Sequence, residues 1–322
     1  MEWAWNDKNH MIISYKNKGG ERLDKFLKSR FSNHSRNYFQ KLIEDNKVTV
    51  NNTLVKPNYT LKAGDQIQIK FSKEVSGIKL SPADIKLDIL FENNDLIAIN
   101  KPAGMTVHPG AGDQDQTLVN ALINYYPNIR FVTHDQTDVS KIRPGIVHRL
   151  DKDTTGIIVV AKNQHALKFI SEQISLRKVK KIYLAICFEW PKLDSGTIIS
   201  YLGRSPKNRK VISDIGIECG RKAVSSYKVK KYFKKNNIKL SLIEFDIKTG
   251  RTHQIRFQAK SIGTPILGDR VYNTKESVKA AKILMAKRQL LHAKEISFTL
   301  ADSNKLCRLS APIPPDFQNI LE

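Results

Sequence analysis

Charged residues are concentrated between Arg143 and Gly156, where the sequence reads RPGIVHRLDKDTTG. The segment holds three cationic residues and two carboxylates around one leucine, and the apolar run Ile157 to Val160 follows it. A carboxylate beside an arginine stays ionised, so it is available as a nucleophile or a base. The spacing does not choose between Asp151 and Asp153. For such a segment taken alone, a structural ion pair beside a turn is the stronger interpretation.

Tyr183 is a second candidate for a functional residue, because it follows a basic stretch over residues 177–181, RKVKK. An aromatic residue between two aliphatic ones in a strand is usually part of the core. The neighbouring cations, however, bring this position close to a basic surface. Both a core role and a binding role stay open.

The segment over residues 250–256, GRTHQIR, predicts the start of a helix. Thr252 is the expected N-cap, and the buried stripe of the helix leaves Arg256 outside it. The backbone N–H groups of a helix start can bind phosphate. We interpret His253 as structural.

Two clusters of cations lie further along the chain, at residues 204–210 and at residues 228–239. The first contains Arg204, Lys207, Arg209 and Lys210, and we favour RNA contact for it. The second includes Tyr232 and Phe233, and for it RNA contact and a solvated face stay equally open.

The composition restricts the classes of partner and cofactor. The 322 residues include 54 Lys and Arg against 31 Asp and Glu, a formal charge of +23, which favours a polyanionic partner. Three widely spaced cysteines and eight unclustered histidines predict neither a disulfide framework nor a metal site. No nucleotide-binding loop and no apolar run of membrane-spanning length is present, so we expect a cytoplasmic protein without a cofactor.

Apolar spacing predicts an α+β protein with two domains. Residues 21–71 combine two amphipathic helices, the second from Ser35 to Asn46, with strands near 48–50 and 66–71. Residues 72–84 lose this periodicity and are the expected linker, and residues 1–20 form an N-terminal extension. From 85 to 322, strand-length apolar runs alternate irregularly with helices near 164–177, 252–262 and 276–288.

Several motifs resemble known families. ERLDKFL, SRNYFQKLI, VTVNN and LKAGDQI, within residues 21–71, are similar to an S4 RNA-binding domain. HRLDKDTTG looks like the signature of the pseudouridine synthases that also carry S4 domains, with Thr155 where Ser is common. The resemblance continues in family order through INKPAGMTVHPG (99–110), RKVKKIYLAI (177–186), TGRTHQIR (249–256), PILGDRVY (265–272), LLHA (290–293) and APIPPDF (311–317). The chain looks most like the D type, which acts on the ribosomal large subunit.

This resemblance implies roles for four residues. Asp151 corresponds to the catalytic aspartate, and Arg149 to the arginine that fills the space left by the flipped nucleotide. Tyr183 corresponds to the tyrosine that stacks on the target uracil and is a candidate for removing the C5 proton. Arg256 corresponds to the arginine that pairs with the catalytic carboxylate. It also implies a mixed, largely antiparallel catalytic sheet behind a small S4 domain.

The sequence therefore predicts a pseudouridine synthase that isomerises uridine in large-subunit ribosomal RNA without a metal or small-molecule cofactor. The expected partner is ribosomal RNA or a pre-ribosomal particle, with no membrane, and the expected state is a monomer. The alternatives are a synthase acting on tRNA and a catalytically silent S4-bearing assembly factor. A glycoside hydrolase would call for paired acidic residues, and Glu is scarce around HRLD.

Overall fold

The computed structural model describes residues 3–5, 11–17, 19–31, 36–71, 80–110, 115–134, 142–206, 208, 211–303 and 305–322. The chain forms two compact units, one within residues 1–79 and the other within residues 80–134 and 144–322. Most of the predicted linker lies outside the described residues, as do Lys207, Arg209 and Lys210. The exact domain boundaries stay a prediction.

The first unit packs two helices, α1 (Leu23–Arg30) and α2 (Arg36–Glu44), against a small antiparallel sheet. The strand order is β1-β2-β5-β3-β4, so β1 (Trp3–Trp5) and β2 (Met11–Ser14) add to β3 (Val48–Val50), β4 (Thr53–Leu54) and β5 (Gln66–Ile69). Asn46 has the predicted left-handed conformation after α2, with φ 59°. The buried Asp24 carboxylate accepts hydrogen bonds from Arg22 and Arg36 and thereby ties α1 to α2.

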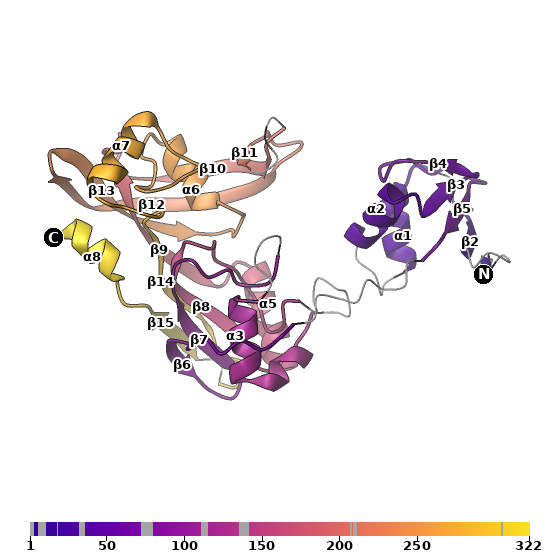
Figure 1. Cartoon of the computed structure of the whole chain (residues 1–322), viewed down its shortest axis with the longest axis horizontal. Helices are drawn as coiled ribbons and strands as arrows, with labels where there is room; N and C mark the ends of the chain where they lie inside the picture. Colours follow the sequence, from indigo (N-terminus) through magenta and orange to yellow (C-terminus); the bar gives the residue numbers. More distant parts are fainter. Residues whose placement is uncertain are drawn as a thin grey trace. The chain divides into compact units, whose positions relative to one another are not determined.

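The second unit is built on one large sheet with the strand order β11-β10-β12-β13-β9-β14-β8-β7-β6, and β15 pairs with β14 (Figure 1). The described pairings are antiparallel except that of β14 with β8. This confirms the predicted α+β class. The strands are β6 (Ile89–Glu92), β7 (Leu96–Lys101), β8 (Thr155–Ala161), β9 (Lys180–Phe188), β10 (Ser195–Arg204), β11 (Ile212–Asp214), β12 (Arg221–Lys235), β13 (Ile238–Ile247), β14 (Leu291–Thr299) and β15 (Leu306–Ser310).

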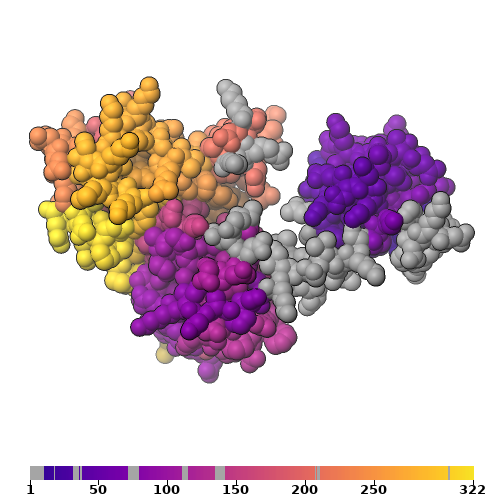
Figure 2. All heavy atoms as spheres, viewed as in Figure 1, coloured from indigo at the N-terminus to yellow at the C-terminus, as the bar shows by residue number. Residues whose placement is uncertain are grey.

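Helices cover both faces of this sheet. The helical elements are α3 (Leu118–Tyr125), the 3-10 helix η1 (Pro127–Phe131), α5 (Gln164–Ser175), α6 (Gln254–Ser261), α7 (Lys275–Ile283) and α8 (Pro315–Leu321). Residues alternate between faces along β9. Tyr183 and Ala185 share a core with α6, whereas Ile186 shares one with α7 and α8. Helices α7 and α8 contribute to one core, and the yellow C-terminal region adjoins orange atoms in the space-filling view (Figure 1, Figure 2).

The start of the second unit is fixed by hydrogen bonds to α3. The Asn120 side chain donates to the Ser81 carbonyl at 2.7 Å, and the Ala83 N–H donates to the Asn120 carbonyl at 3.1 Å. The last residues of the predicted linker are therefore packed on this unit. None of the described helices is both long enough and apolar enough to cross a bilayer.

Candidate active site

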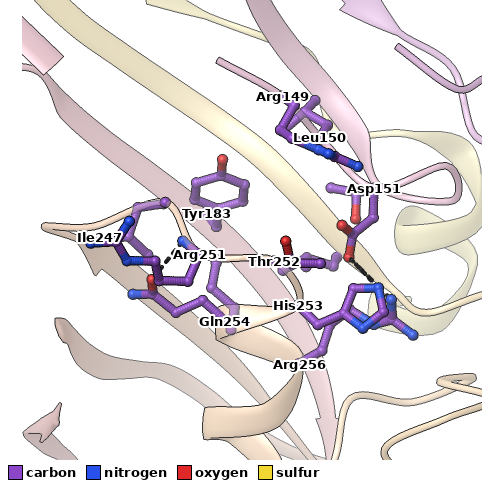
Figure 3. A pocket seen from close by; sticks show the side chains of 14 residues that line it. Arg149, Leu150, Asp151, Tyr183, Ile247, Arg251, Thr252, His253, Gln254 and Arg256 are labelled. Atoms are coloured by element: carbon purple, nitrogen blue, oxygen red, sulfur yellow. Dashed lines mark hydrogen bonds and ion pairs between the residues drawn. The ribbon is translucent and has the colours of Figure 1, made fainter. Parts of the chain in front are cut away.

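The four residues singled out from the sequence lie around one pocket, although they come from three distant segments (Figure 3). Arg149 and Asp151 belong to the loop before β8, Tyr183 to β9 and Arg256 to α6. The same pocket is lined by Leu150, Thr154, Ile247, Gly250, Arg251, Thr252, His253, Gln254, Ile255 and Leu291. Folding thus brings a carboxylate, an aromatic ring and two guanidinium groups together.

A chain of ion pairs runs from the pocket into the protein interior. The Arg256 Nη1 atom donates to Asp151 Oδ2 at 3.1 Å. On its other side, Arg256 donates from Nε and Nη2 to the two oxygens of Asp269 at 2.7 and 3.0 Å. This bidentate geometry holds the planar guanidinium in one orientation, so one N–H is aimed at Asp151.

The Arg256–Asp269 pair is buried, since the two residues are 6% and 3% exposed. Burial would lower the pKa of Arg256, but the hydrogen bonds and charges of Asp269 and Asp151 outweigh it and raise that pKa. Burial would likewise raise the pKa of Asp269, but Arg256 and the N–H groups of Tyr272 and Val271 lower it. Both groups therefore stay charged at neutral pH, which makes Arg256 a fixed cation beside Asp151.

The loop that carries Asp151 is held by two buried basic side chains, Lys101, whose pKa burial lowers to about 7, and Arg288. Lys101, which is fully buried, donates to the carbonyls of Pro102, Met105 and Lys152 at 2.7 to 2.9 Å. Arg288 donates to the Asp153 carbonyl at 2.9 Å and forms a bidentate pair with Asp316 at 2.6 and 2.8 Å.

These contacts separate the two carboxylates that the spacing left equivalent. Asp151 lines the pocket and pairs with Arg256, whereas Asp153 borders a different cavity, with Arg288 and Asp316. A backbone hydrogen bond also fixes the position of Asp151 in the loop, since the Thr154 N–H donates to the Asp151 carbonyl at 3.1 Å. Asp151 is therefore the carboxylate available to a ligand in this pocket.

Tyr183 lies across the pocket from Asp151 (Figure 3), and Ile247 and Leu291 line the same pocket. Only 7% of the residue is exposed, so it belongs to the core and to the pocket at once. Burial and then the Asp151 charge raise the pKa of its hydroxyl. A phenol in this environment stays protonated at neutral pH.

The start of α6 differs from the prediction, because Thr252 is not the N-cap. The helix begins at Gln254, and His253, in the left-handed region with φ 55°, occupies the capping position without a side-chain cap. The Gln254 side chain instead accepts hydrogen bonds from the Arg251 N–H at 3.0 Å and the Thr249 hydroxyl at 2.8 Å. The tight turn before the helix replaces the ordinary cap.

This turn places His253 in the pocket. Its Nε2 atom lies 4.0 Å from Asp151 Oδ2, and its Nδ1 atom lies 3.0 Å from the Tyr272 hydroxyl. Burial, followed by the positive charges of Arg256 and Arg149, lowers the pKa of His253 against the opposing effect of Asp151 and Asp269. The imidazole is therefore neutral at pH 7.

His148, the first residue of the HRLD motif, supports the sheet. Its Nε2 atom accepts a hydrogen bond from the Val159 N–H at 3.0 Å, which requires the neutral form. Burial, and after it the charge of the nearby Lys181, lower the pKa of His148 to about 3. The histidine thus fixes the loop to β8.

Sequence reasoning assigned no role to Asp269, Lys101 or Arg288. The first two stand in blocks that carried the family resemblance, GDRVY and INKPAG. Nothing in the spacing says that these blocks meet the HRLD segment, which is why the supporting residues were missed.

Comparison with known proteins identifies the family. A family model described as RNA pseudouridylate synthase matches residues 95–261, and an S4 domain model matches residues 21–67. The chain belongs to the RNA pseudouridine synthase family. It is therefore an isomerase acting on RNA, with an S4 domain ahead of its catalytic domain.

Relatives match along most of the chain. An uncharacterized RNA pseudouridine synthase of Chlorobaculum parvum is 39% identical over 316 residues, which cover 94% of this chain and 93% of that protein. The ribosomal large subunit pseudouridine synthase D of Xanthomonas campestris is 35% identical over 309 residues, 94% of this chain and 88% of that protein. The fold is shared with human RNA pseudouridylate synthase domain containing 1, with a TM-score of 0.56 at 22% identity over 70% of this chain and 83% of that chain.

Proposed function

We propose that this enzyme converts uridine to pseudouridine in large-subunit ribosomal RNA and that Asp151 is its catalytic residue. The substrate class is supported by the relatives named as ribosomal large subunit pseudouridine synthases, at about 35% identity. The observation that carries the catalytic assignment is the Asp151 carboxylate, held at 3.1 Å by a guanidinium that is itself fixed by Asp269.

The reaction requires the target base to leave the RNA stack, because the C1′–N1 bond must break and C1′ must join C5. Arg149 is exposed and lines two neighbouring pockets, the one with Asp151 and one with Thr106 and His108. In our proposal its guanidinium enters the space that the flipped nucleotide leaves. The vacated stack is then filled by a planar cation that also contacts phosphate.

Inside the pocket, Tyr183 stacks on the uracil and Asp151 faces the sugar and the ring. An anionic oxygen beside C1′ or C6 is a nucleophile, and beside C2′ it is a base, so attack at the sugar, attack at the ring and elimination to a glycal all use this carboxylate. Each route balances, since the C1′–N1 and C5–H bonds break, the C1′–C5 and N1–H bonds form, and reactant and product are isomers. Arg256 keeps the carboxylate in one position through each step.

The raised pKa of Tyr183 favours stacking over proton removal as its role. A protonated phenol accepts a proton poorly, whereas its ring face needs no ionisation to contact uracil. Stacking on an aromatic ring also suits any orientation of the base during its rotation.

The test of the catalytic assignment is Asp151→Asn, with Asp153→Asn as the matched control. We expect Asp151→Asn to abolish tritium release from RNA carrying 5-tritiated uridine while RNA affinity stays within a few fold. Asp153→Asn should keep its turnover. Turnover by Asp151→Asn, or loss in Asp153→Asn alone, would contradict the proposal.

The substrate is tested separately by deleting the gene and mapping pseudouridines in ribosomal RNA and tRNA. Loss of sites in the large-subunit RNA is expected, and loss confined to tRNA would refute the ribosomal assignment. If the protein were an assembly factor without catalytic activity, deletion of its gene would remove no pseudouridine from either RNA. The expectation of a cytoplasmic monomer stays a prediction.

A further inference from the structure

Two exposed aromatic rings lie together outside the active-site pocket. Trp190 follows β9 and Tyr232 belongs to β12; they are 41% and 39% exposed, and their ring centroids are 5.4 Å apart with an interplanar angle of 58°. Single exposed aromatic residues are common, but a contacting pair presents a continuous apolar surface to solvent.

Both rings are held in place by polar bonds at their edges. The Trp190 indole donates from Nε1 to the Leu240 carbonyl at 2.9 Å, and the Tyr232 hydroxyl donates to Asp194 at 2.7 Å. The faces of the rings are therefore presented without free rotation. A ligand that stacks on them loses little side-chain entropy on binding.

Lysines surround the two rings. The Lys239 ammonium lies 5.3 Å from the centroid of Trp190, and Lys234 is paired opposite Lys239 in the β12–β13 ladder. Lys192 is exposed in the segment that follows Trp190. We call these five residues the aromatic patch: Trp190, Lys192, Tyr232, Lys234 and Lys239. The carboxylate of Asp194 lies beside this patch, and it already accepts a hydrogen bond from the Tyr232 hydroxyl.

Strand register places the aromatic patch on the same face of the sheet as the active site. Tyr183 is paired with Phe245, and Tyr232 is paired with Ser241. Directly paired residues share a face, and Ser241 and Phe245 share one because they are four positions apart on β13. The separation along that strand is about 13 Å.

We propose that the aromatic patch binds unpaired bases of the RNA that flank the target uridine, by stacking on Trp190 and Tyr232 while the lysines contact phosphates. Paired aromatic faces among cations are the features that single-stranded RNA needs, and every base offers a face to stack. The inference rests on the RNA substrate shown by the family and not on the ribosomal assignment. It also gives a function to the second basic cluster of the sequence.

The first test compares ring removal with ring retention in the full-length enzyme. The probe is a 15-nucleotide oligouridylate, with a blunt RNA duplex of equal length beside it. Trp190→Ala with Tyr232→Ala should weaken binding of the single strand by about 5- to 150-fold for each base that loses its stacking partner, and it should leave the duplex unchanged. Trp190→Phe with Tyr232→Phe keeps both rings but loses their polar bonds, and it should stay within about threefold of wild type. Phe131→Ala, at an 81% exposed aromatic residue in η1, is the matched control and should change nothing.

The second test uses Trp190 itself as the reporter, which needs no change in the aromatic patch. Trp3 and Trp5 are the other two tryptophans of the chain, so Trp3→Phe with Trp5→Phe leaves one emitting indole. Its fluorescence should be quenched when the oligouridylate saturates the enzyme. Lys234→Ala with Lys239→Ala should in addition reduce the slope of log Kd against log salt by about 0.7 for each phosphate that the variant no longer binds.

Three results would overturn the proposal. One is unchanged affinity of the folded double alanine variant. Another is an equal loss of affinity in the double phenylalanine variant, which would assign the rings a structural role. The third is unaltered Trp190 emission at saturating RNA, which would show that RNA does not contact the aromatic patch and would favour a protein partner there.

Discussion

Replacing Asp269 by Asn changes one atom of a side chain that is 3% exposed and accepts four hydrogen bonds. The amide oxygen can still accept from the N–H groups of Val271 and Tyr272, both now bonded to Oδ1. The new NH₂ group, however, would face Arg256, which is also a donor. Arg256 then remains buried without one of its two carboxylate partners.

The expected loss of stability is about 3–5 kcal/mol, the usual cost of removing one member of a buried ion pair. The rate should fall as well, because the freed guanidinium no longer fixes Asp151. A displacement of about 1 Å costs on the order of 100-fold in rate, so we expect a 10- to 100-fold loss at saturating RNA.

The measurements are urea unfolding and single-turnover pseudouridine formation. The control is Glu295→Gln, since Glu295 pairs with Arg308 at 3.5 Å and Arg308 is 63% exposed. An exposed pair contributes at most about 1 kcal/mol, and this variant should keep its full rate. If Asp269→Asn were as stable and as active as the control, the reasoning from the buried network would be refuted.

Three further predictions follow from the same geometry. Arg256→Ala should lose nearly all tritium release while Arg256→Lys keeps a measurable part, because lysine supplies charge without the planar fork; equal rates would refute the pairing role. Tyr183→Phe should turn over near the wild-type rate, and normal binding with a stalled reaction would instead make its hydroxyl the base. The pKa of His148 is lowered from 6.5 to about 3, so its stabilisation is present above pH 6.5 and is lost as the pH falls toward 3. Wild type should lose up to about 5 kcal/mol over this range by urea unfolding, and His148→Gln should lack that component.

Apolar periodicity predicted the α+β class, because it is a local property, whereas the segments that meet in the pocket were implied by the family resemblance. Asn46 shows how far local rules reach, since an Asn after an amphipathic helix suffices to predict the left-handed residue. Thr252 shows where they fail. Threonine favours the N-cap position, but the Gln254 side chain binds the preceding turn, and the helix starts one residue later than a Thr252 cap predicts.

The ion-pair chain could not be predicted from spacing. Arg256 is 13 positions away from Asp269 in the sequence and 105 positions away from Asp151. Which of several acidic residues reaches a given cation depends on how β14 and β8 pair and on where α6 crosses the sheet. The distinction between Asp151 and Asp153 is equally tertiary, since it depends on which of them faces Arg256.

Charge acts on two length scales in this enzyme. The net charge of +23 attracts RNA over distances that salt limits to about 8–10 Å around each exposed group. Within the pocket, the lining includes three arginines, Arg149, Arg251 and Arg256, and one carboxylate, Asp151, so the lining carries a net positive charge. Asp269 neutralises part of this excess from the buried side, where no phosphate reaches it. A phosphodiester can therefore approach the pocket without repulsion, and in the proposed mechanism the Asp151 carboxylate then lies beside the sugar.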